Sequence, residues 1–501
     1  MKKILKSLVL VCLGWALLWA AGISATLPDQ FAQKAREMEQ KAYYTQAIKD
    51  FQQASNLYLQ QGAPKAAEAC RIKARLLGNI LQEYDYDKSQ ALKVLQETFP
   101  GMSEAEREKL LEKADYLTID GKPRYFDGFA ANLMSRNPEL MKLSPHKIEG
   151  LRTFYRKFLD LMASVKGAYP EEKSRAYVSP ITYQWTTKVE IPRKELPVKG
   201  LFRLWVPVPV ETAAQRNIKV YEANPGEFAP FPPQIAREIG LAYFEVPLEK
   251  LKENLNISVK FLFTHYAQLF QIDPERVGSY NPNKTMYLLY TACEGNASYT
   301  PEMQAKALEV VGSEKNPYLR AKALYYYIVK NISYSLMPHC TLSALNKPES
   351  IFVFEKGYGD CGAQSTYFVA LCRSLGIPAR ITGGFQLWPG YEGPHFWAEF
   401  YLPNYGWIPV DTSAAQLATN LPELSEKEVA QYVDYFFGSQ DPCRFIIQTQ
   451  GDATPLPLNA EPLDLRMAIQ FPTAECSTME QNPNILVQKY LKTEFSPVDR
   501  N

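Results

Sequence analysis

The pattern of apolar positions changes twice along this chain of 501 residues. From about residue 27 to 166, apolar residues recur at helical spacing, as at Ala47, Phe51 and Ala54, which places them on one stripe of a helix. From about 177 to 290 the period becomes two, in segments such as TYQWTTKVEI and NISVKFLFTHY, which predicts antiparallel strands. Helical spacing returns at Thr300. This alternation over such a length predicts a multidomain protein of the α+β class.

These changes of period divide the chain into five predicted parts. They are a targeting or anchoring segment (1–25), a helical hairpin region (27–166), an antiparallel β-domain (177–295), a mixed core (300–420) and a C-terminal extension (421–501). Asp120-Gly121 predicts a hairpin turn inside the helical region. In the extension, the pattern predicts a helix from Glu426 to Tyr435 and a strand from Arg444 to Gln448.

The helical region contains one stretch with a repeat-like pattern. The spacing A-x3-F-x2-A in AIKDFQQASNLY resembles the second helix of a tetratricopeptide repeat. Only one copy is convincing and no clean 34-residue period follows, so a generic helical bundle explains the pattern equally well. A helical region of either kind is expected to bind protein partners or the cell wall.

The first 25 residues have the features of an export signal. Lys2, Lys3 and Lys6 precede an uncharged apolar stretch that ends in small residues, which is the pattern of a secretory signal peptide. We expect export to the periplasm or cell surface. The stretch is also long enough, at about 19 residues, to remain as a single membrane anchor.

The composition argues against several classes of partner and cofactor. The 55 basic and 54 acidic side chains nearly cancel, so no basic field would attract nucleic acid. The chain has 4 histidines and 8 cysteines with no CxxC, which gives little support to a zinc site, His339 beside Cys340 included. No Asp-rich calcium loop is evident. We therefore expect no metal and no cofactor.

The strongest chemical signal lies in GYGDCGAQSTYFVALCRSLGIPAR. Its apolar residues predict a helix that stops at Gly376 and Pro378, and Asp360 is a good N-cap, which makes Cys361 the first helical residue. A helix N-terminus carries partial positive charge and free N–H groups, which acidify a thiol and can face a developing oxyanion. The Asp360 carboxylate works in the opposite direction, because a negative charge nearby opposes thiolate formation.

The segment GPHFWAEFYLPNYGWIPVDT follows and reads as two antiparallel strands. His395, Trp397 and Glu399 share one face of the first strand. A turn near Pro403 would return the chain so that Asp411 lies beside His395, where a carboxylate can orient the imidazole and stabilise its charged form. A lone cysteine in an apolar helix is usually a core residue, but a nucleophile at a helix start followed by His and Asp on adjoining strands predicts a catalytic triad.

The same residues resemble the transglutaminase-like superfamily, whose core has a papain-like Cys-His-Asp arrangement. The matching motifs cover about 100 residues and are Gly359-Asp360-Cys361, Gly376-Ile377-Pro378-Ala379-Arg380, Gly383-Gly384, His395-Phe396-Trp397-Ala398-Glu399 and Gly406-Trp407 with Asp411. WVPVP resembles part of the β-domain that precedes many bacterial cores of this kind, and YFFGSQDPCRF resembles a weaker family tail. The resemblance implies that Cys361, His395 and Asp411 are the catalytic residues.

Such a triad implies acyl transfer at an amide or peptide carbonyl, with a protein or peptide substrate, cell-wall peptide included. Water as acceptor would make the protein a cysteine peptidase or amidase, and a lysine amine would make it a cross-linking acyltransferase. Two further hypotheses stay open: an inactive descendant that only binds, and an envelope scaffold in which Cys361 is disulfide-bonded. Tyr334 and Trp397 are candidates for a second oxyanion donor.

Overall fold

The computed structural model describes residues 26–167, 176–457, 469–476, 478–479 and 482–498. The predicted signal or anchor, residues 1–25, lies outside this range. The chain forms two compact units. Of the described residues, the first unit contains 26–92 together with Asp115–Asp127, and the second contains Lys93–Ala114 and those from Gly128 onward.

The first unit is built from antiparallel helices packed through small side chains. Its helices are α2 (Leu27–Gln40), α3 (Tyr44–Gln60) and α4 (Pro64–Glu83), followed by the start of α5 (Lys88–Thr98). The predicted stripe of Ala47, Phe51 and Ala54 is buried where α3 packs against its neighbours. These helical hairpins agree with the predicted helical pattern, whereas the resemblance to a tetratricopeptide repeat stays a prediction.

The predicted hairpin turn at Asp120-Gly121 is confirmed. It joins β1 (Tyr116–Ile119) to β2 (Lys122–Tyr125), with Ile119 opposite Lys122. Both turn residues have positive φ, 50° for Asp120 and 76° for Gly121, which is the conformation that a two-residue hairpin turn requires.

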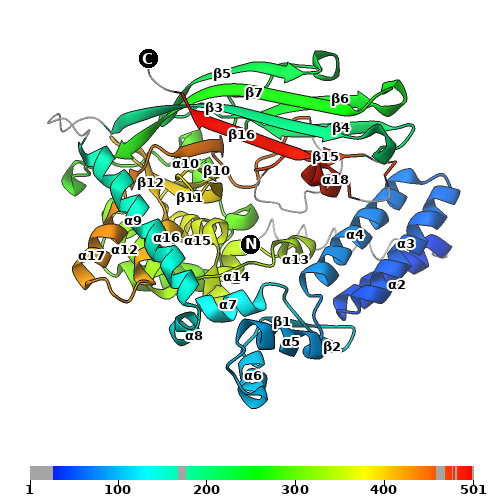
Figure 1. Cartoon of the computed structure of the whole chain (residues 1–501), viewed down its shortest axis with the longest axis horizontal. Coiled ribbons are helices and arrows are strands. Elements are labelled where there is room, and N and C mark those ends of the chain that lie inside the picture. Colours follow the sequence, from blue (N-terminus) through cyan, green and yellow to red (C-terminus); the bar gives the residue numbers. More distant parts are fainter. Residues whose placement is uncertain (1–25, 168–175, 458–468, 477, 480–481, 499–501) are drawn as a thin grey trace, which may run out of the picture. The chain divides into compact units, whose positions relative to one another are not determined.

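The second unit contains two antiparallel sheets in the region predicted to be a β-domain (Figure 1). In the larger sheet, β7 (Leu255–Leu269) lies between β3 (Tyr177–Ile191) and both β5 (Gln215–Asn224) and β13 (Ser439–Gln440), and β16 (Leu491–Pro497) pairs with β3. The smaller sheet has the order β15 (Thr473–Glu475), β4 (Leu201–Pro207), β6 (Leu241–Pro247). Strands far apart in the sequence therefore share these sheets, since β13, β15 and β16 all follow the predicted core.

The mixed core is a four-stranded antiparallel sheet with a buried helix against it. The strand order is β12 (Gly406–Val410), β11 (Gly393–Leu402), β10 (Ala379–Gln386), β14 (Arg444–Gln448). Helix α15 (Cys361–Ser374) packs on β10 and β11, and every residue from Gly362 to Ser374 is buried. Around it lie α11 (Pro301–Val311), α12 (Pro317–Asn331), α14 (Glu349–Lys356) and α16 (Thr412–Thr419).

The predicted elements of the core and the extension agree with the structure. Helix α11 starts after Thr300, whose hydroxyl caps it, α17 spans Glu426–Tyr435, and β14 spans Arg444–Gln448. The remaining short elements of this unit are α6 (Glu104–Leu111), α7 (Phe129–Ser135), α8 (Pro138–Lys142), α10 (Thr285–Tyr290), β8 (Ser333–Tyr334), α13 (His339–Ala344), β9 (Tyr358–Gly359) and α18 (Pro483–Lys489).

Helix α9 (Pro145–Gly167) packs onto the core, although it precedes the β-domain in sequence. Phe158 is buried between Trp388, with ring centroids 4.6 Å apart, and Phe436, at 5.0 Å. Figure 1 shows α9 running along the side of the core beside α16. One hydrophobic cluster continues from α9 through the core into the β-domain, where Trp185 contacts Phe445 at 4.8 Å. These parts therefore share a single hydrophobic core.

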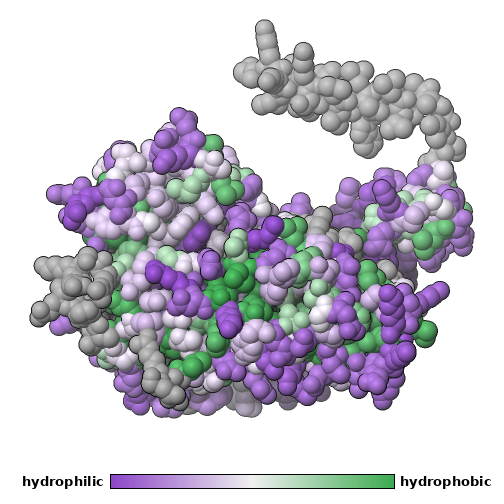
Figure 2. Space-filling view, turned by 90° about the horizontal axis from the view of Figure 1, so that it is seen from above, coloured by the Kyte–Doolittle hydropathy of each residue, from purple (hydrophilic) through white to green (hydrophobic). Residues whose placement is uncertain are grey.

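On the face shown in Figure 2, hydrophobic areas are interrupted by hydrophilic residues. Large exposed apolar side chains such as Leu59, Val198 and Leu288 are far apart in the sequence. Among the described helices, none has both the length and the hydropathy needed to cross a bilayer.

Candidate active site

Cys361 occupies the position predicted for it, the first residue of a buried helix. Asp360 is the N-cap of α15, and its Oδ1 accepts the backbone N–H of Ala363 at 2.9 Å. The helix buries its remaining residues against β10 and β11, so the thiol is held at the one end of α15 that opens into a cavity. Cys361 carries a free thiol, which contradicts the hypothesis of a scaffold with a disulfide at this position.

His395 and Asp411 come from neighbouring strands, as their spacing predicts. Strands β11 and β12 are antiparallel with Ala398 opposite Val410, so that Asp411, directly after β12, reaches His395 near the start of β11. His395 Nε2 lies 2.8 Å from Asp411 Oδ2, and both side chains are buried. Against an ionised carboxylate Nε2 must be the protonated nitrogen, which leaves Nδ1 with a lone pair.

Strand β10 lies between the start of β11 and β14 in the sheet. Gly384 pairs with His395 on one side and with Ile446 on the other. A Cβ at position 384 would lie 1.8 Å from the backbone oxygen of Phe445, which no rearrangement of a side chain could relieve. The glycine of the predicted Gly383-Gly384 motif therefore allows β14 to come close enough to place Arg444 beside the site.

Asp411 binds more than the histidine. Its Oδ1 accepts the backbone N–H of Ala414 at 3.0 Å, because Asp411 is also the N-cap of α16. Arg444 Nη1 donates to Oδ2 of Asp411 at 2.9 Å, and the Arg444 guanidinium also binds Oδ2 of Asp441 through Nε at 3.0 Å and Nη2 at 2.8 Å. Burial raises the pKa of Asp411, but the charges of His395 and Arg444 outweigh burial and bring the pKa well below its usual value.

Arg444 and Asp441 were not predicted to belong to the site. Both side chains are completely buried in the described structure, where an isolated charge would be costly. Two charged residues inside the apolar run YFFGSQDPCRFII were a signal that could have identified them, because such charges are buried only when paired.

The sulfur of Cys361 lies among groups that oppose its ionisation. Burial raises the pKa of the thiol most, and the charge of Asp360 raises it further, whereas the backbone N–H of Phe396 lowers it. The N–H of Gly362 at the helix start lowers the pKa of the thiol, as expected, but burial and the predicted opposing charge of Asp360 outweigh it. The Phe396 N–H contact also shows that the sulfur lies against β11 next to His395.

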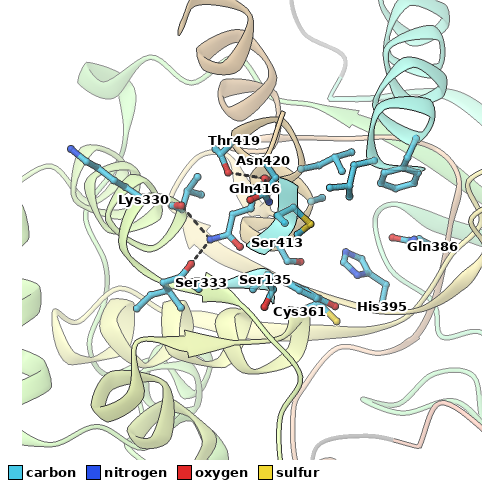
Figure 3. Close-up of a pocket in the computed structure, with 18 of the residues that line it drawn as sticks. Ser135, Lys330, Ser333, Cys361, Gln386, His395, Ser413, Gln416, Thr419 and Asn420 are labelled. Atoms are coloured by element: carbon cyan, nitrogen blue, oxygen red, sulfur yellow. Dashed lines mark hydrogen bonds between the residues drawn. The ribbon is translucent and has the colours of Figure 1, made fainter. Parts of the chain in front are cut away.

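Cys361 and His395 line the same cavity, which has a volume of about 450 Å³. Figure 3 shows the sulfur and the imidazole side by side on its wall. Other lining residues come from α7, α8 and α9 (Ser135, Met141, Leu151, Phe154), from the end of α12 and β8 (Val329 to Tyr334), from β10, β11 and their connection (Gln386, Pro394, Trp388), and from α16 and its C-cap (Ser413, Ala414, Gln416, Leu417, Thr419, Asn420). Helices that precede the β-domain therefore form part of the wall around the thiol.

The two candidates for a second oxyanion donor lie in different surroundings. Tyr334 lines the cavity, and its pKa is raised well above the usual value, first by the neighbouring Cys361 and then by burial. Trp397 does not line this cavity; its ring is buried against Arg444 at 5.1 Å and beside Ile446. Of these two residues, only Tyr334 therefore lies where its side chain can reach a negative charge that develops on the substrate.

The segment that carries Tyr334 is held by α7. Asn132 Nδ2 donates to the backbone oxygen of Leu336 at 3.0 Å, and the N–H of Leu336 donates to Asn132 Oδ1 at 2.8 Å. Ser135 and Ser335 exchange a hydrogen bond at 3.0 Å, and Arg136 stacks on the ring of Tyr358 at 4.5 Å. Helix α7 thus holds the loop that follows Tyr334 in place.

No metal site accompanies these groups in the part of the chain that the structure describes, where no cluster of three or more His, Cys, Asp or Glu side chains is suited to hold an ion. His339, weighed as a ligand beside Cys340, instead has a carboxylate on each ring nitrogen, Glu349 Oε1 at 2.7 Å from Nδ1 and Asp360 Oδ2 at 2.6 Å from Nε2.

A thiol at the start of a helix that packs on a sheet bearing a His–Asp pair defines the class of papain-like cores. Residues 304–412 match the family model of the transglutaminase-like superfamily. This part of the chain is therefore a transglutaminase-like domain, which confirms the resemblance in its motifs.

The chain also resembles individual proteins over limited ranges. An uncharacterised protein of Haemophilus influenzae is 27% identical over 156 residues, which cover 26% of this chain and 42% of that relative. Among solved structures, a candidate cysteine protease from Cytophaga hutchinsonii has 15% identity and a TM-score of 0.37 over 65% of this chain and 93% of its own. The periplasmic domain of TgpA from Pseudomonas aeruginosa has 14% identity and a TM-score of 0.25 over 53% and 94%.

Proposed function

We propose that this protein is a thiol enzyme that transfers or hydrolyses acyl groups at amide or peptide carbonyls, with Cys361 as nucleophile, His395 as general base and Asp411 as the group that orients His395. One observation carries the proposal. His395 binds Asp411 through Nε2 at 2.8 Å and shares a cavity wall with Cys361, so its second nitrogen is available to the thiol.

The raised pKa of the thiol gives His395 a necessary role. A thiol that is not ionised at rest becomes a nucleophile only when a base removes its proton. Transfer of that proton from Sγ to Nδ1 of His395 creates an imidazolium, which the Asp411 carboxylate stabilises. The Cys361 sulfur then forms a bond to the carbonyl carbon of the substrate.

The tetrahedral intermediate carries its negative charge on the former carbonyl oxygen. The N–H of Cys361, one of the free donors at the start of α15, and the Tyr334 hydroxyl are the groups proposed to bind that oxygen. The His395 imidazolium donates its proton to the departing amine as the C–N bond breaks, which leaves a thioester on Cys361. His395 then removes a proton from the acceptor, and the acceptor attacks the thioester and releases the thiol.

Water or an amine can serve as the acceptor, and we favour water. A protein or peptide substrate is proposed, cell-wall peptide included, because the cavity is about 450 Å³ and open to the surface. The basic and apolar pattern of residues 1–25 supports export, either cleaved or as an anchor. The helical region 27–166 is proposed to bind protein partners.

The decisive experiment measures ammonia release and amine incorporation on glutamine-containing peptides, together with cleavage of peptide libraries. Wild type is compared with Cys361→Ala and with Cys293→Ala, which removes an exposed thiol outside the cavity. We expect all activity to be lost in Cys361→Ala and retained in Cys293→Ala. Equal activity of the wild type and Cys361→Ala would overturn the proposal.

The alternative of an inactive binding protein is separated by a second measurement. A thiol-reactive electrophile such as iodoacetamide is expected to label Cys361 in the wild type and to label it far more slowly in His395→Ala, because the base is gone. If the labelling rate of Cys361 is the same in His395→Ala as in the wild type, the result would favour a binding protein whose cysteine is not activated.

A further inference from the structure

A second histidine lies beside the nucleophile, between two carboxylates. His339, the first residue of α13, contacts Glu349 Oε1 through Nδ1 at 2.7 Å and Asp360 Oδ2 through Nε2 at 2.6 Å. The other oxygen of Asp360 caps α15 through Ala363 at 2.9 Å. A continuous chain of hydrogen bonds therefore runs from α14 through α13 to the residue that precedes Cys361.

These contacts define the protonation state of the imidazole. A neutral imidazole has one N–H and one lone pair, so it can donate to only one of two ionised carboxylates. Both distances fit charge-assisted hydrogen bonds, which an imidazolium can donate from its two ring nitrogens at once. Burial lowers the pKa of His339, but the charges of Glu349 and Asp360 outweigh it and hold the pKa well above its usual value.

The groups around this chain are few. Burial raises the pKa of Glu349, and Asp452 adds a further negative charge near it. Burial also acts to raise the pKa of Asp360, but His339 and the N–H groups at the start of α15 bring it below its usual value. Asp360 is therefore ionised next to the reactive sulfur, and His339 is the cation that faces it.

The thiol of Cys361 faces a different set of groups on its other sides. His395 and Asp411 approach from the sheet and Tyr334 from β8, while Asp360 is the charge that most opposes ionisation of the thiol. A capping carboxylate at this position fixes the helix start but suppresses the thiolate. An imidazolium bound to that carboxylate places a positive charge against it, which opposes its field at the sulfur and leaves the cap intact.

We propose that His339, held by Glu349, is a positioning residue whose imidazolium neutralises the capping carboxylate of Asp360, so that Cys361 can ionise at the start of α15. The inference deepens the proposed function, because it concerns the nucleophile of that site. His339 does not line the cavity and would act only through Asp360.

The test measures the rate of alkylation of Cys361 by iodoacetamide between pH 5 and pH 10, followed by mass spectrometry of the peptide that contains Cys361. Where the midpoint of the rate profile lies above this range, it is extrapolated from the rates relative to those of a small free thiol. In His339→Gln we expect the midpoint of the rate profile to rise by about one pH unit, a tenfold loss of thiolate at a fixed pH below it. In His339→Gln/Asp360→Asn the midpoint returns to the wild-type value or below, because asparagine caps the helix without a charge. His146→Gln, an exposed histidine on α9, is the control and keeps the wild-type profile.

An unchanged midpoint in His339→Gln, or a raised midpoint that Asp360→Asn does not reverse, would overturn the inference. If His339→Gln does not fold, the Asp360→Asn variant alone still tests the inference. Its midpoint must equal or fall below that of the wild type, and a rise would contradict the role given to the carboxylate. Because alkylation reports on the thiol without any substrate, this inference and the proposed amide chemistry can fail separately.

Discussion

Arg444 donates a hydrogen bond to Oδ2 of Asp411 at 2.9 Å, the same oxygen that lies 2.8 Å from His395 Nε2. The orienting carboxylate is therefore shared between an imidazole and a permanent cation. The Nε and Nη2 groups of the same guanidinium bind Asp441, so two carboxylates and one arginine are buried together. The positive charge of Arg444 keeps Asp411 ionised. Its hydrogen bond also holds the Asp411 carboxylate in the orientation that presents Oδ2 to His395.

Removal of Arg444 is predicted to be costly, because it leaves two buried carboxylates without their cation. We expect Arg444→Met to lower the free energy of unfolding by about 3–5 kcal/mol and to lower kcat in the protein that remains folded. Thermal denaturation and kcat measured at a permissive temperature check this. Arg380→Met is the matched control: Arg380 pairs with Glu399 at 2.6 Å on the same sheet but has no contact with Asp411, so it should affect stability and spare kcat.

The ionised state of Asp411 predicts how stability depends on pH. The pKa of Asp411 is held well below its usual value in the folded protein, so the folded state binds its proton less tightly than the unfolded chain does. Its contribution is complete above about pH 4, the carboxyl pKa of an unfolded chain, and is lost as the pH falls below that value. Urea denaturation from pH 7 to pH 3 should show the free energies of wild type and Asp411→Asn converging toward acid. Curves that stay parallel would contradict this.

Tyr334 is predicted to bind the oxyanion. Tyr334→Phe removes only the hydroxyl at the cavity, and the residue as a whole is 43% exposed, so the fold should tolerate it. We expect kcat to fall by about 10- to 1,000-fold with little change in KM, because the hydroxyl acts on a charge that develops in the transition state. Tyr221→Phe, with 44% of its side chain exposed on β5, should leave both constants unchanged. A rise in KM alone would mean that Tyr334 only binds the substrate.

Phe154 of α9 is predicted to contact the substrate. Its ring packs on Trp388 at 4.9 Å and on Tyr391 at 4.4 Å and forms part of the cavity wall. Phe154→Ala should raise KM and lower kcat/KM by about tenfold for peptides, since an aromatic wall contact contributes about 1–2 kcal/mol. Leu159→Ala, an exposed position on the same helix, serves as the control. If Phe154→Ala and Leu159→Ala have the same kcat/KM for peptides, Phe154 does not contact the substrate.

The local structure of the site could be predicted from the amino-acid sequence. A capping residue, the spacing of apolar positions and a turn between two strands depend on residues close together in the chain, so the helix starting at Cys361 and the His395–Asp411 pair could both be predicted. The same locality explains the confirmed turn at Asp120-Gly121 and the confirmed helix and strand in the C-terminal extension.

Tertiary structure alone decided which distant residues surround that site. Arg444 reaches Asp411 only because β14 pairs with β10 at a glycine, His339 reaches Asp360 although α14 and β9 lie between them in the sequence, and α9 packs on a core that begins more than 130 residues later. No local pattern encodes these contacts, because a charge is buried or exposed, and a thiol acidified or suppressed, according to neighbours that only the folded chain brings together.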